Sequence, residues 1–539
     1  MIYVILGQTA SGKTALATEV CKKCHLPMIN ADAYQCYKFM DIGTSKPTAE
    51  ELEGLEYYFI NDREPNEPID VKAYQEKGRQ IIEKLMAEGK DIVISGGTSF
   101  YIKALLFPYE FPEIDEKISE EYKDKSLEEL LSVLEVEDKA TYDIIDKNNY
   151  PRVYNAVLLC KSNYSRANLI SKNDGKPIYP CEFFAIDIGR DEVNKKINLR
   201  VDKMMEEGLI NEVLTLFRQY GAKDNYAFKA IGYQEFVPYL QEDGNISKDS
   251  IPQLTEDIKL HTRQYAKRQR TFIRTQFKNV NVYQGVAQDI FDTICNEIDS
   301  KRRSRALLGD KVCHAFENKT VAVLGLGGVG SLIPSYLVRF GVRNLILVDF
   351  DKVDITNLNR QMMYDLSDLN KLKAEVQSEK LKKISPLVNT ISYCHKITEN
   401  NDFLCGHRVD FIFDCIDFIP GKANILKYAT DNNIDVIVSG GLGFKLDSTK
   451  VQVTTMDKSD DRLIVAVKNY LVDNNISGIN LDKIKVVTSK EARIKLGKKD
   501  VIGSVCTTPN AGGLAMISYF INKIKKDVED EENIKWFRY

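Results

Sequence analysis

The sequence has no apolar run long enough to cross a membrane. Its longest apolar stretches, such as the one around Gly512 to Ile521, fall short of the about 18 to 20 residues that a bilayer-spanning helix needs. The first residues, MIYVILGQTASGKT, contain neither a charged n-region nor a signal-cleavage site. We therefore expect no membrane partner and no secretion signal, and we expect a cytoplasmic protein.

The sequence also lacks a dense cysteine framework. Its 11 cysteines are scattered over 539 residues, which excludes the disulfide-rich secreted class and favours free thiols in a reducing compartment. One cluster, Cys21-Lys22-Lys23-Cys24-His25, formally matches a c-type haem attachment site. It falls where we expect the helix after a phosphate-binding loop, so we interpret the match as a coincidence on a helix surface.

A large excess of charge of either sign is absent as well. The formal net charge is −4, so nucleic-acid binding would require a local basic face. Hydrophobic residues make up 43% and charged residues 28%, which excludes a disordered or low-complexity chain. At 539 residues the chain exceeds one domain of about 100 to 200 residues, so at least two domains are expected.

Two segments share one pattern, in which a short apolar run leads into a glycine-rich turn and then a helix. Ile2–Leu6 precedes GQTASGKT, and Thr320–Gly325 precedes LGGVGS. Both patterns indicate a buried parallel strand that feeds a helix N-terminus. The apolar patterns predict further strands at 91–97, 345–350, 410–415, 435–441 and 450–456, and helical stretches at 126–161, 191–220 and 252–277. We place the junction of the two halves near 300–305.

The first glycine turn satisfies the phosphate-loop pattern G-x-x-x-x-G-K-[ST] in the required strand-to-helix context. Its residues are Gly7, Gln8, Thr9, Ala10, Ser11, Gly12, Lys13 and Thr14. Backbone N–H groups of such a loop curl around phosphate oxygens, Lys13 supplies a positive charge, and the Thr14 hydroxyl can hold Mg²⁺. The loop alone leaves open whether the phosphates belong to a nucleotide, as in a kinase, or to another diphosphate.

Further motifs resemble the tRNA dimethylallyltransferase (tRNA isopentenyltransferase) family over about residues 1–298. They are Ile29 to Lys38, Asp41 to Pro47, Gly96 to Leu105, Arg200-Val201-Asp202, Glu207-Gly208-Leu209, Ala230 to Tyr233 and Thr262 to Gln269. The resemblance implies transfer of a dimethylallyl group from dimethylallyl diphosphate to N6 of the adenosine 3′ of the tRNA anticodon. Asp32 would then be the general base, with Lys13 and Thr14 on the leaving diphosphate.

The same resemblance implies that the anticodon stem-loop of tRNA is the partner, contacted by Asp32, Ala33, Tyr34, Gln35, Thr98 and Arg152. A cationic stripe supports an RNA substrate independently. Arg263, Lys267, Arg270 and Arg274 recur at helical spacing, Arg268 lies beside them, and no acid occurs between His261 and Arg274. An ordinary solvated helix face is the alternative interpretation, although such faces usually carry interspersed acids.

The second glycine turn, Gly325-Leu326-Gly327-Gly328-Val329-Gly330, followed by Asp349, would by itself also fit a Rossmann dehydrogenase. The chain continues with Asn357, Arg360, Lys373 and the run Asp414-Cys415-Ile416-Asp417. This array resembles the ubiquitin-activating-enzyme-like adenylyltransferase (ThiF/MoeB/HesA) superfamily. The segments Gly440 to Thr449, Lys485 to Glu491 and Gly503 to Val505 resemble its tRNA threonylcarbamoyladenosine dehydratase branch.

The second resemblance implies ATP-dependent adenylation of a carboxylate, followed by cyclisation with loss of AMP. The implied ATP-binding residues are Gly325, Gly327, Gly328, Gly330, Asp349, Asn357, Arg360, Lys373 and Asp417, with Arg303 reaching the ATP of a neighbouring subunit. Arg360, Lys373 and Asp417 would serve catalysis, and Asp417 would hold Mg²⁺. The five cysteines from Cys313 to Cys506 contain no paired CxxC motifs, so we expect no zinc.

The fold class that follows is α/β. A P-loop NTPase-like parallel sheet, with a helical insertion at 111–170 and basic helices, forms a domain at 1–300, and a Rossmann-like doubly wound adenylyltransferase domain occupies 301–539. We expect a bifunctional tRNA-modifying enzyme that is a homodimer through its second domain. For the first half, the alternative is a P-loop kinase. For the second half, there are two alternatives. One is a non-catalytic dimerisation or tRNA-binding module, and the other is an enzyme that activates a sulfur carrier and uses a sulfur-acceptor partner.

Overall fold

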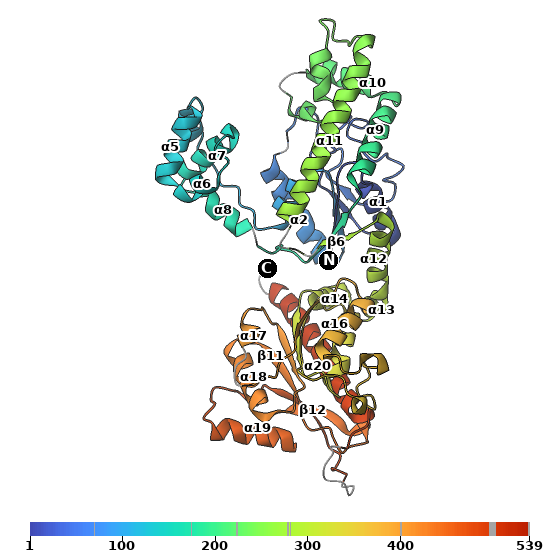
Figure 1. The fold of residues 1–539 in the computed structure, drawn as a ribbon, viewed down its shortest axis with the longest axis vertical. Coiled ribbons are helices and arrows are strands. Elements are labelled where there is room, and N and C mark those ends of the chain that lie inside the picture. Colours follow the sequence, from blue (N-terminus) through green and yellow to red (C-terminus); the bar gives the residue numbers. More distant parts are fainter. Residues whose placement is uncertain are drawn as a thin grey trace. The chain divides into compact units, whose positions relative to one another are not determined.

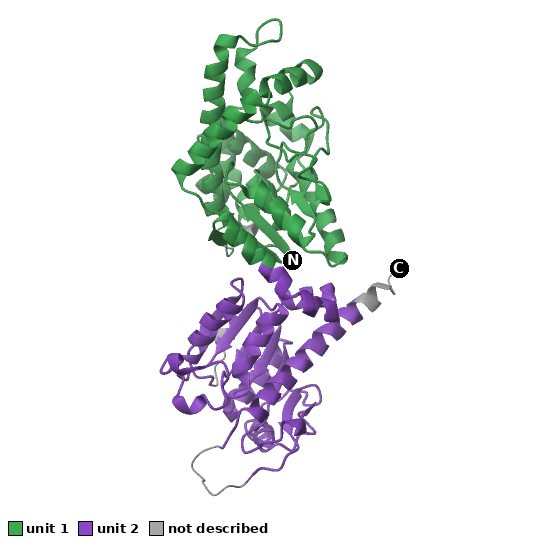
Figure 2. Ribbon diagram, turned by 90° about the vertical axis from the view of Figure 1, so that its right-hand side faces the viewer, with its two compact units in different colours: residues 1–295 green, residues 296–539 purple. Residues whose placement is uncertain are grey.

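The computed structural model describes residues 1–68, 70–173, 175–222, 225–277, 280, 282–398, 402–494 and 503–536. The chain divides into two compact units, Met1–Cys295 and Asn296–Tyr539 (Figure 2). The boundary lies inside helix α12 (Ala287–Ser300), without a proline- or glycine-rich linker. The functional domain limits expected from the sequence, 1–300 and 301–539, stay predictions.

Unit 1 is built on a six-stranded parallel sheet with the order β3-β2-β4-β1-β5-β6 (Figure 1). The strands are β1 (Ile2–Leu6), β2 (Met28–Asn30), β3 (Tyr57–Tyr58), β4 (Ile92–Ser95), β5 (Cys181–Ile186) and β6 (Val282–Gly285). All residues of β1 and β4 are buried, as expected for central parallel strands covered on both faces. The strands predicted at 2–6 and 91–97 are therefore confirmed.

Helices surround this sheet and form the insertion between α3 and β5. They are α1 (Lys13–Cys24), α2 (Val71–Ala87), α3 (Ser99–Leu106), α4 (Glu116–Tyr122), α5 (Leu127–Glu137), α6 (Lys139–Ile144), α7 (Tyr150–Lys161), α8 (Arg166–Asn173), α9 (Arg190–Glu206), α10 (Leu209–Tyr220), η1 (Tyr226–Lys229), η2 (Gln234–Tyr239), η3 (Lys248–Ser250) and α11 (Ile251–Gln276). The helical stretch predicted at 252–277 is confirmed as α11. The stretches predicted at 126–161 and 191–220 are broken into three and two helices.

Local capping explains the first of these breaks. The Ser126 side chain accepts a hydrogen bond from the N–H of Glu129, and the Glu129 side chain accepts one from the N–H of Ser126. This capping box starts α5. Asp138 then ends α5 and caps α6 by accepting from the N–H of Thr141, and Asn149 caps α7. These helices bury their own small cluster, which includes Leu130, Leu134 and Val157, separately from the core around the sheet. The insertion is thus a helical subdomain with its own core.

Unit 2 is built on a seven-stranded sheet with the order β12-β13-β11-β10-β7-β8-β9, in which only the pair β12–β13 is antiparallel. Its strands are β7 (Thr320–Leu324), β8 (Asn344–Val348), β9 (Asn389–Tyr393), β10 (Phe411–Asp414), β11 (Asp435–Ser439), β12 (Val451–Thr455) and β13 (Lys485–Ser489). The predicted strands are confirmed. The strand order reverses between β7 and β10, where doubly wound sheets bind their ligands.

The helices of unit 2 cover both faces of this sheet (Figure 1). They are α13 (Arg302–Leu308), α14 (Asp310–Glu317), η4 (Gly330–Leu332), α15 (Ile333–Phe340), η5 (Ile355–Asn357), η6 (Leu366–Asp368), α16 (Lys373–Ile384), α17 (Asp402–Cys405), α18 (Ile419–Asp431), η7 (Ser448–Lys450), α19 (Arg462–Asp473) and α20 (Thr507–Trp536). None of the helices in the described parts of either unit combines the length and hydrophobicity that crossing a bilayer requires.

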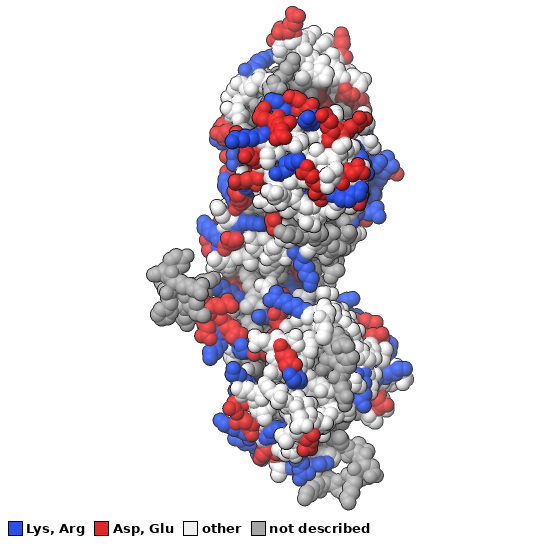
Figure 3. All heavy atoms as spheres, turned by 90° about the vertical axis from the view of Figure 1, so that its left-hand side faces the viewer, with Lys and Arg blue, Asp and Glu red and all other residues white. Residues whose placement is uncertain are grey.

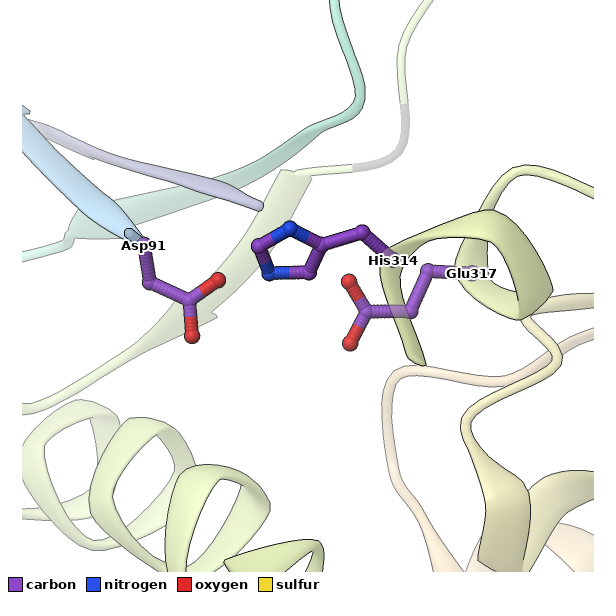
Figure 4. A group of neighbouring side chains, drawn as sticks. All are labelled: Asp91, His314 and Glu317. Carbon is purple, nitrogen blue, oxygen red and sulfur yellow. The ribbon is translucent and has the colours of Figure 1, made fainter. Parts of the chain in front are cut away.

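Buried ion pairs fix the first helices of unit 2. The Lys301 ammonium lies 2.6 Å from Glu297 Oε1 and 2.9 Å from Glu317 Oε1, and all three side chains are buried. Figure 4 shows His314 and Glu317 projecting from α14, one turn apart. The third residue drawn there, Asp91, belongs to unit 1, where it accepts a hydrogen bond from the Met1 amino group. These carboxylates therefore have structural partners within their own units.

Candidate active sites

The predicted phosphate loop connects β1 to α1. The N–H of Ser11 donates to the carbonyl oxygen of Gln8 at 3.2 Å, which closes the turn, and Lys13 is the first residue of α1. The N-terminus of a helix carries unpaired N–H groups and the positive end of the helix dipole. The loop is therefore a ready anion site at the carboxyl end of the central strand.

The Lys13 side chain is buried in this loop. Its ammonium donates to the Gln8 carbonyl at 3.3 Å. The pKa of Lys13 is lowered to about 8, mainly by burial; the negative charge of Asp32 opposes this shift, and the positive charge of Arg200 adds to it. A buried cation with these neighbours is poised to receive an anion.

Asp32 follows β2 and faces the end of the neighbouring strand β4. Its Oδ1 accepts hydrogen bonds from the N–H groups of Tyr34 at 3.0 Å and Gln35 at 3.4 Å. A Cβ on Gly97 would lie only 2.4 Å from Asp32 Oδ2, so glycine is required there for the carboxylate to fit. The N–H of Ala33 donates to Thr98 Oγ1 at 3.0 Å. The carboxyl ends of β2 and β4 thereby hold Asp32 in one orientation.

Helix α11 and helix α9 reach the phosphate loop. The N–H of Thr9 donates to Gln269 Oε1 at 2.7 Å, and Gln269 Nε2 donates to the carbonyl of Gly97 at 2.5 Å. The Arg200 guanidinium donates to Thr9 Oγ1 at 3.3 Å, and burial lowers the pKa of this arginine. The residues predicted for the site included neither Arg200 nor Gln269. Both residues lie in motifs that carry the family resemblance, and this membership is the sequence feature that could have indicated their place in the site.

The predicted RNA-binding stripe lies on α11, but its members differ in their surroundings. Arg263 donates to Asn198 Oδ1 at 2.6 Å, and Arg270 lies 3.7 Å from Asp187 Oδ1. The guanidinium of Arg268 lies 5.8 Å from the centre of the Tyr265 ring, and burial raises the pKa of Tyr265 to about 12. Lys267 and Arg274 are exposed. The tertiary structure thus adds an acid to a stripe that has none in its sequence.

Two other predicted RNA contacts lie in different settings. Gln35 is buried, and its Nε2 donates to the carbonyls of Thr44 and Ser45, so its amide nitrogen is engaged within the unit. Arg152 is exposed on α7 in the helical subdomain, and within the described residues no contact joins it to Asp32 or the phosphate loop. On the face drawn in Figure 3, acidic and basic side chains are interspersed over unit 1.

The second glycine turn lies at the point where the strand order of unit 2 reverses. A Cβ on Gly330 would lie 1.9 Å from the carbonyl oxygen of Gly325, so this turn closes only with glycine at position 330. A Cβ on Gly325 would lie 2.9 Å from the backbone of Cys415, which follows β10. The ends of β7 and β10 are therefore in close contact at the expected ligand position.

Asp349 lies beside this turn, and Lys373 lies in the electrostatic neighbourhood of Asp349. Asp349 Oδ2 accepts from the N–H of Leu326 at 2.6 Å, and its Oδ1 accepts from the N–H of Asp351 at 2.8 Å. Burial raises the pKa of Asp349, and the positive charge of Lys373 opposes that rise. The buried Lys373 begins α16 and lies 3.0 Å from Asp351 Oδ2. A carboxylate thus contacts the glycine turn, and a buried cation lies near that carboxylate.

The other predicted residues of the second site are less buried than Asp349 and Lys373. Asn357 Oδ1 accepts from the N–H of Asp354 at 3.3 Å, and the half-buried Arg360 donates to the carbonyl of Thr356. Arg360 lies close to the turn, because a Cβ on Gly328 would be 3.7 Å from its side chain. Asp417 is exposed after β10, and Arg303 is exposed on α13.

Comparison with known proteins assigns the first unit. Residues 35–276 match the IPP transferase family. The tRNA dimethylallyltransferase of Acetivibrio thermocellus is 35% identical over 300 residues, which are 54% of this chain and 93% of that protein. The chain belongs to the tRNA dimethylallyltransferase family. The transferase of an Exiguobacterium strain is similarly related, at 36% identity over 53% of this chain and 90% of that protein.

Beyond this transferase unit, residues 300–469 match the ThiF family, so the chain is a fusion of the two. Two solved structures are similar to the separate parts. The isopentenylpyrophosphate transferase of Staphylococcus epidermidis is 33% identical, with a TM-score of 0.40 over 56% of this chain and 99% of that one. The tRNA N6-threonylcarbamoyladenosine dehydratase of E. coli is 26% identical, with a TM-score of 0.41 over 43% of this chain and 96% of that one.

Proposed function

We propose that the chain is a bifunctional, cytoplasmic tRNA-modifying enzyme. The transferase unit attaches a dimethylallyl group to N6 of the adenosine 3′ of the tRNA anticodon. The observation that carries this proposal is the position of Asp32 in the electrostatic neighbourhood of Lys13 and the phosphate loop. A proton acceptor and a diphosphate site thus share one edge of the sheet.

The reaction exchanges one bond for another. The N6 nitrogen bonds to the allylic carbon while the carbon–oxygen bond to the diphosphate breaks, and the N6 proton passes to a carboxylate oxygen of Asp32. Lys13 and the loop N–H groups stabilise the negative charge of the leaving diphosphate. Because the Asp32 carboxylate is fixed by two N–H donors, it is oriented before the substrate arrives.

The donor set of the loop suits Mg²⁺. Thr14 follows Lys13 in the first turn of α1 and offers a hydroxyl oxygen, and Mg²⁺ takes such hard oxygen ligands together with phosphate oxygens. Bound there, the ion would neutralise charge on the diphosphate. In the second unit, the exposed carboxylate of Asp417 is the corresponding ligand for Mg²⁺ with ATP.

Asp32→Asn tests the first activity. Transfer of labelled dimethylallyl to an anticodon stem-loop RNA is expected to fall about 100- to 10,000-fold in kcat, while RNA affinity is retained. Asp62→Asn is the matched control, because Asp62 pairs with Lys77 on the surface of the same unit. ATP-dependent phosphorylation of the RNA or of a small substrate, without dimethylallyl transfer, would instead identify a P-loop kinase.

For the ThiF unit we propose ATP-dependent cyclisation of N6-threonylcarbamoyladenosine at the same position in other tRNAs. The carboxylate of the substrate attacks the α-phosphate of ATP, pyrophosphate leaves, and ring closure then releases AMP. Asp349 would hold the ribose hydroxyls, and Lys373, Arg360 and Asn357 would face the phosphates. The observation that supports this is the buried Lys373 in the electrostatic neighbourhood of Asp349, whose carboxylate accepts from the glycine turn at the strand-order reversal.

Lys373→Met tests the second activity. We expect ATP–pyrophosphate exchange that depends on threonylcarbamoylated tRNA to fall about 100- to 1,000-fold. Lys371→Met is the control, because Lys371 is exposed two residues earlier. A wild-type chain that binds this tRNA but shows no exchange would make the unit a non-catalytic binding or dimerisation module. Exchange that depends instead on a small carrier protein would identify sulfur-carrier activation with a sulfur-acceptor partner.

One tRNA cannot be the substrate of both units, because the two substituents occupy the same N6 nitrogen. The fusion therefore couples two alternative modifications rather than two consecutive steps. We propose that the ThiF unit forms a homodimer in which Arg303 reaches the ATP of the partner subunit. Light scattering of the full chain, together with loss of exchange in Arg303→Ala, would support this arrangement.

A further inference from the structure

Two tyrosines form a stacked pair next to the proposed general base. The rings of Tyr34 and Tyr226 have centroids 6.5 Å apart and planes inclined by 24°. Tyr34 is two residues after Asp32, and its N–H donates to Asp32 Oδ1 at 3.0 Å. The pair therefore lies beside the carboxylate through which the transferase unit would act.

The two rings differ in exposure. Tyr34 is half-buried, and burial, together with the negative charge of Asp32 and the neighbouring tyrosines Tyr226 and Tyr265, raises its pKa. Tyr226 is 44% exposed and adds an accessible aromatic surface to the outer side of the pair. The Lys229 ammonium lies 5.7 Å from the centre of the Tyr226 ring and is itself exposed. An open ring and a cation thus lie side by side.

The backbone that carries the exposed Tyr226 ring is held in place by its neighbours. Tyr226 begins η1, where Asn225 Oδ1 accepts from the N–H of Ala227 at 3.0 Å. The next two residues, Ala227 and Phe228, are buried, and the Phe228 ring packs against Phe217 with centroids 4.9 Å apart. A large apolar ring held in solvent by a rigid turn loses little conformational entropy when a flat ligand stacks on it.

We propose that Tyr226, backed by Tyr34, is a stacking site for a nucleobase of the RNA next to the modified adenosine, with Lys229 contacting its phosphate. Single-stranded RNA is bound by this combination, in which aromatic rings stack on bases and nearby cations meet the backbone. The inference rests on the proposed dimethylallyl transfer, because only an RNA substrate brings a base to Asp32. A dimethylallyl chain fits less well, since it would need an enclosed apolar wall rather than an exposed ring beside an ammonium.

The test uses the full chain and two anticodon stem-loop RNAs. In each RNA, 2-aminopurine replaces the base on one side of the target adenosine, because stacking on an aromatic ring quenches its fluorescence. We expect the unmodified chain to quench one of the two probes. Tyr226→Leu should abolish that quenching and weaken RNA binding about 5- to 100-fold. Tyr226→Phe keeps the ring and should retain both.

Outcomes that overturn the inference are equally defined. Quenching of neither probe by the unmodified chain, or unchanged quenching and affinity in Tyr226→Leu, removes the stacking site. An increase in KM for dimethylallyl diphosphate with unaltered RNA affinity would place the prenyl chain against Tyr226. Lys229→Gln should lower the slope of log K against log salt for RNA binding by about one. An unchanged slope would contradict the phosphate contact.

These measurements separate the inference from the proposed function. Binding and fluorescence are read without diphosphate, so they report stacking even when no group is transferred. An RNA that stacks on Tyr226 but receives no dimethylallyl group would contradict the proposed reaction and leave the binding site standing. Circular dichroism of Tyr226→Leu checks its fold, and Tyr226→Phe supplies the matched variant that retains the aromatic ring.

Discussion

The backbone N–H of Thr9 donates a hydrogen bond to the side-chain oxygen of Gln269, 260 residues away, at 2.7 Å. The other end of the same amide donates to the Gly97 carbonyl at 2.5 Å. One buried side chain therefore ties the phosphate loop to the end of β4 and to the helix that carries the cationic stripe. Under the proposed function, this residue would connect the binding of diphosphate with the binding of RNA.

Replacing Gln269 by leucine should destabilise unit 1. Two backbone groups lose their partner, and an unsatisfied buried polar group costs about 1 to 3 kcal/mol, so we expect a fall of that order in the free energy of unfolding. The KM for dimethylallyl diphosphate should rise as well, because the loop loses its anchor. Urea denaturation and steady-state kinetics measure the two effects. Gln264→Leu, on the exposed face of the same helix, should change neither.

The pH dependence of dimethylallyl transfer should report Lys13. Burial lowers its pKa to about 8, so the charged form that stabilises diphosphate predominates below that pH and is lost as the pH rises through it. We expect kcat/KM to fall above about pH 8, since this parameter follows the free enzyme. In Lys13→Met the activity should be low, and the fall of kcat/KM above about pH 8 should be absent. A profile flat from pH 7 to 10 in the unmodified chain would contradict the assignment.

The exposed cations of α11 should govern the salt dependence of RNA binding. Lys267→Ala and Arg274→Ala should each weaken binding in all RNAs and lower the slope of log K against log salt by about 0.7 to 1. Arg270→Ala should have a smaller effect, because Asp187 already lies 3.7 Å from that guanidinium. Lys203→Ala, an exposed position on α9, is the control. Equal slopes for all four variants would argue against the stripe.

The buried pair of Asp414 and Lys422 should be essential to the fold of unit 2. Both side chains are fully buried, with Lys422 Nζ 3.0 Å from Asp414 Oδ1. Removing one partner leaves an uncompensated buried charge, so Lys422→Ala should lower the free energy of unfolding by about 3 to 5 kcal/mol. Lys427→Ala breaks a surface pair with Asp431 and should cost about 1 kcal/mol or less. Chemical denaturation followed by circular dichroism compares them.

Sequence patterns fail where an element depends on distant partners. The edge strand β9 reads Asn-Thr-Ile-Ser-Tyr, and β3 has only two residues, so neither carries an apolar run that predicts a strand. Each forms because a neighbouring strand supplies the hydrogen bonds, as β8 does for β9. The long helical pattern at 126–161 likewise hides caps at Asp138 and Asn149, whose effect depends on the local backbone.

By itself, the sequence determined the two glycine turns, their strands and the presence of Lys13 at a helix start. These features are local, because a turn and its phosphate chemistry need only neighbouring residues. Tertiary structure alone decided that Gln269 and Arg200 reach Thr9, that Asp187 faces Arg270, and that Tyr226 stacks on Tyr34. The order of strands in the sheets brings those residues together, and the local patterns do not specify that order.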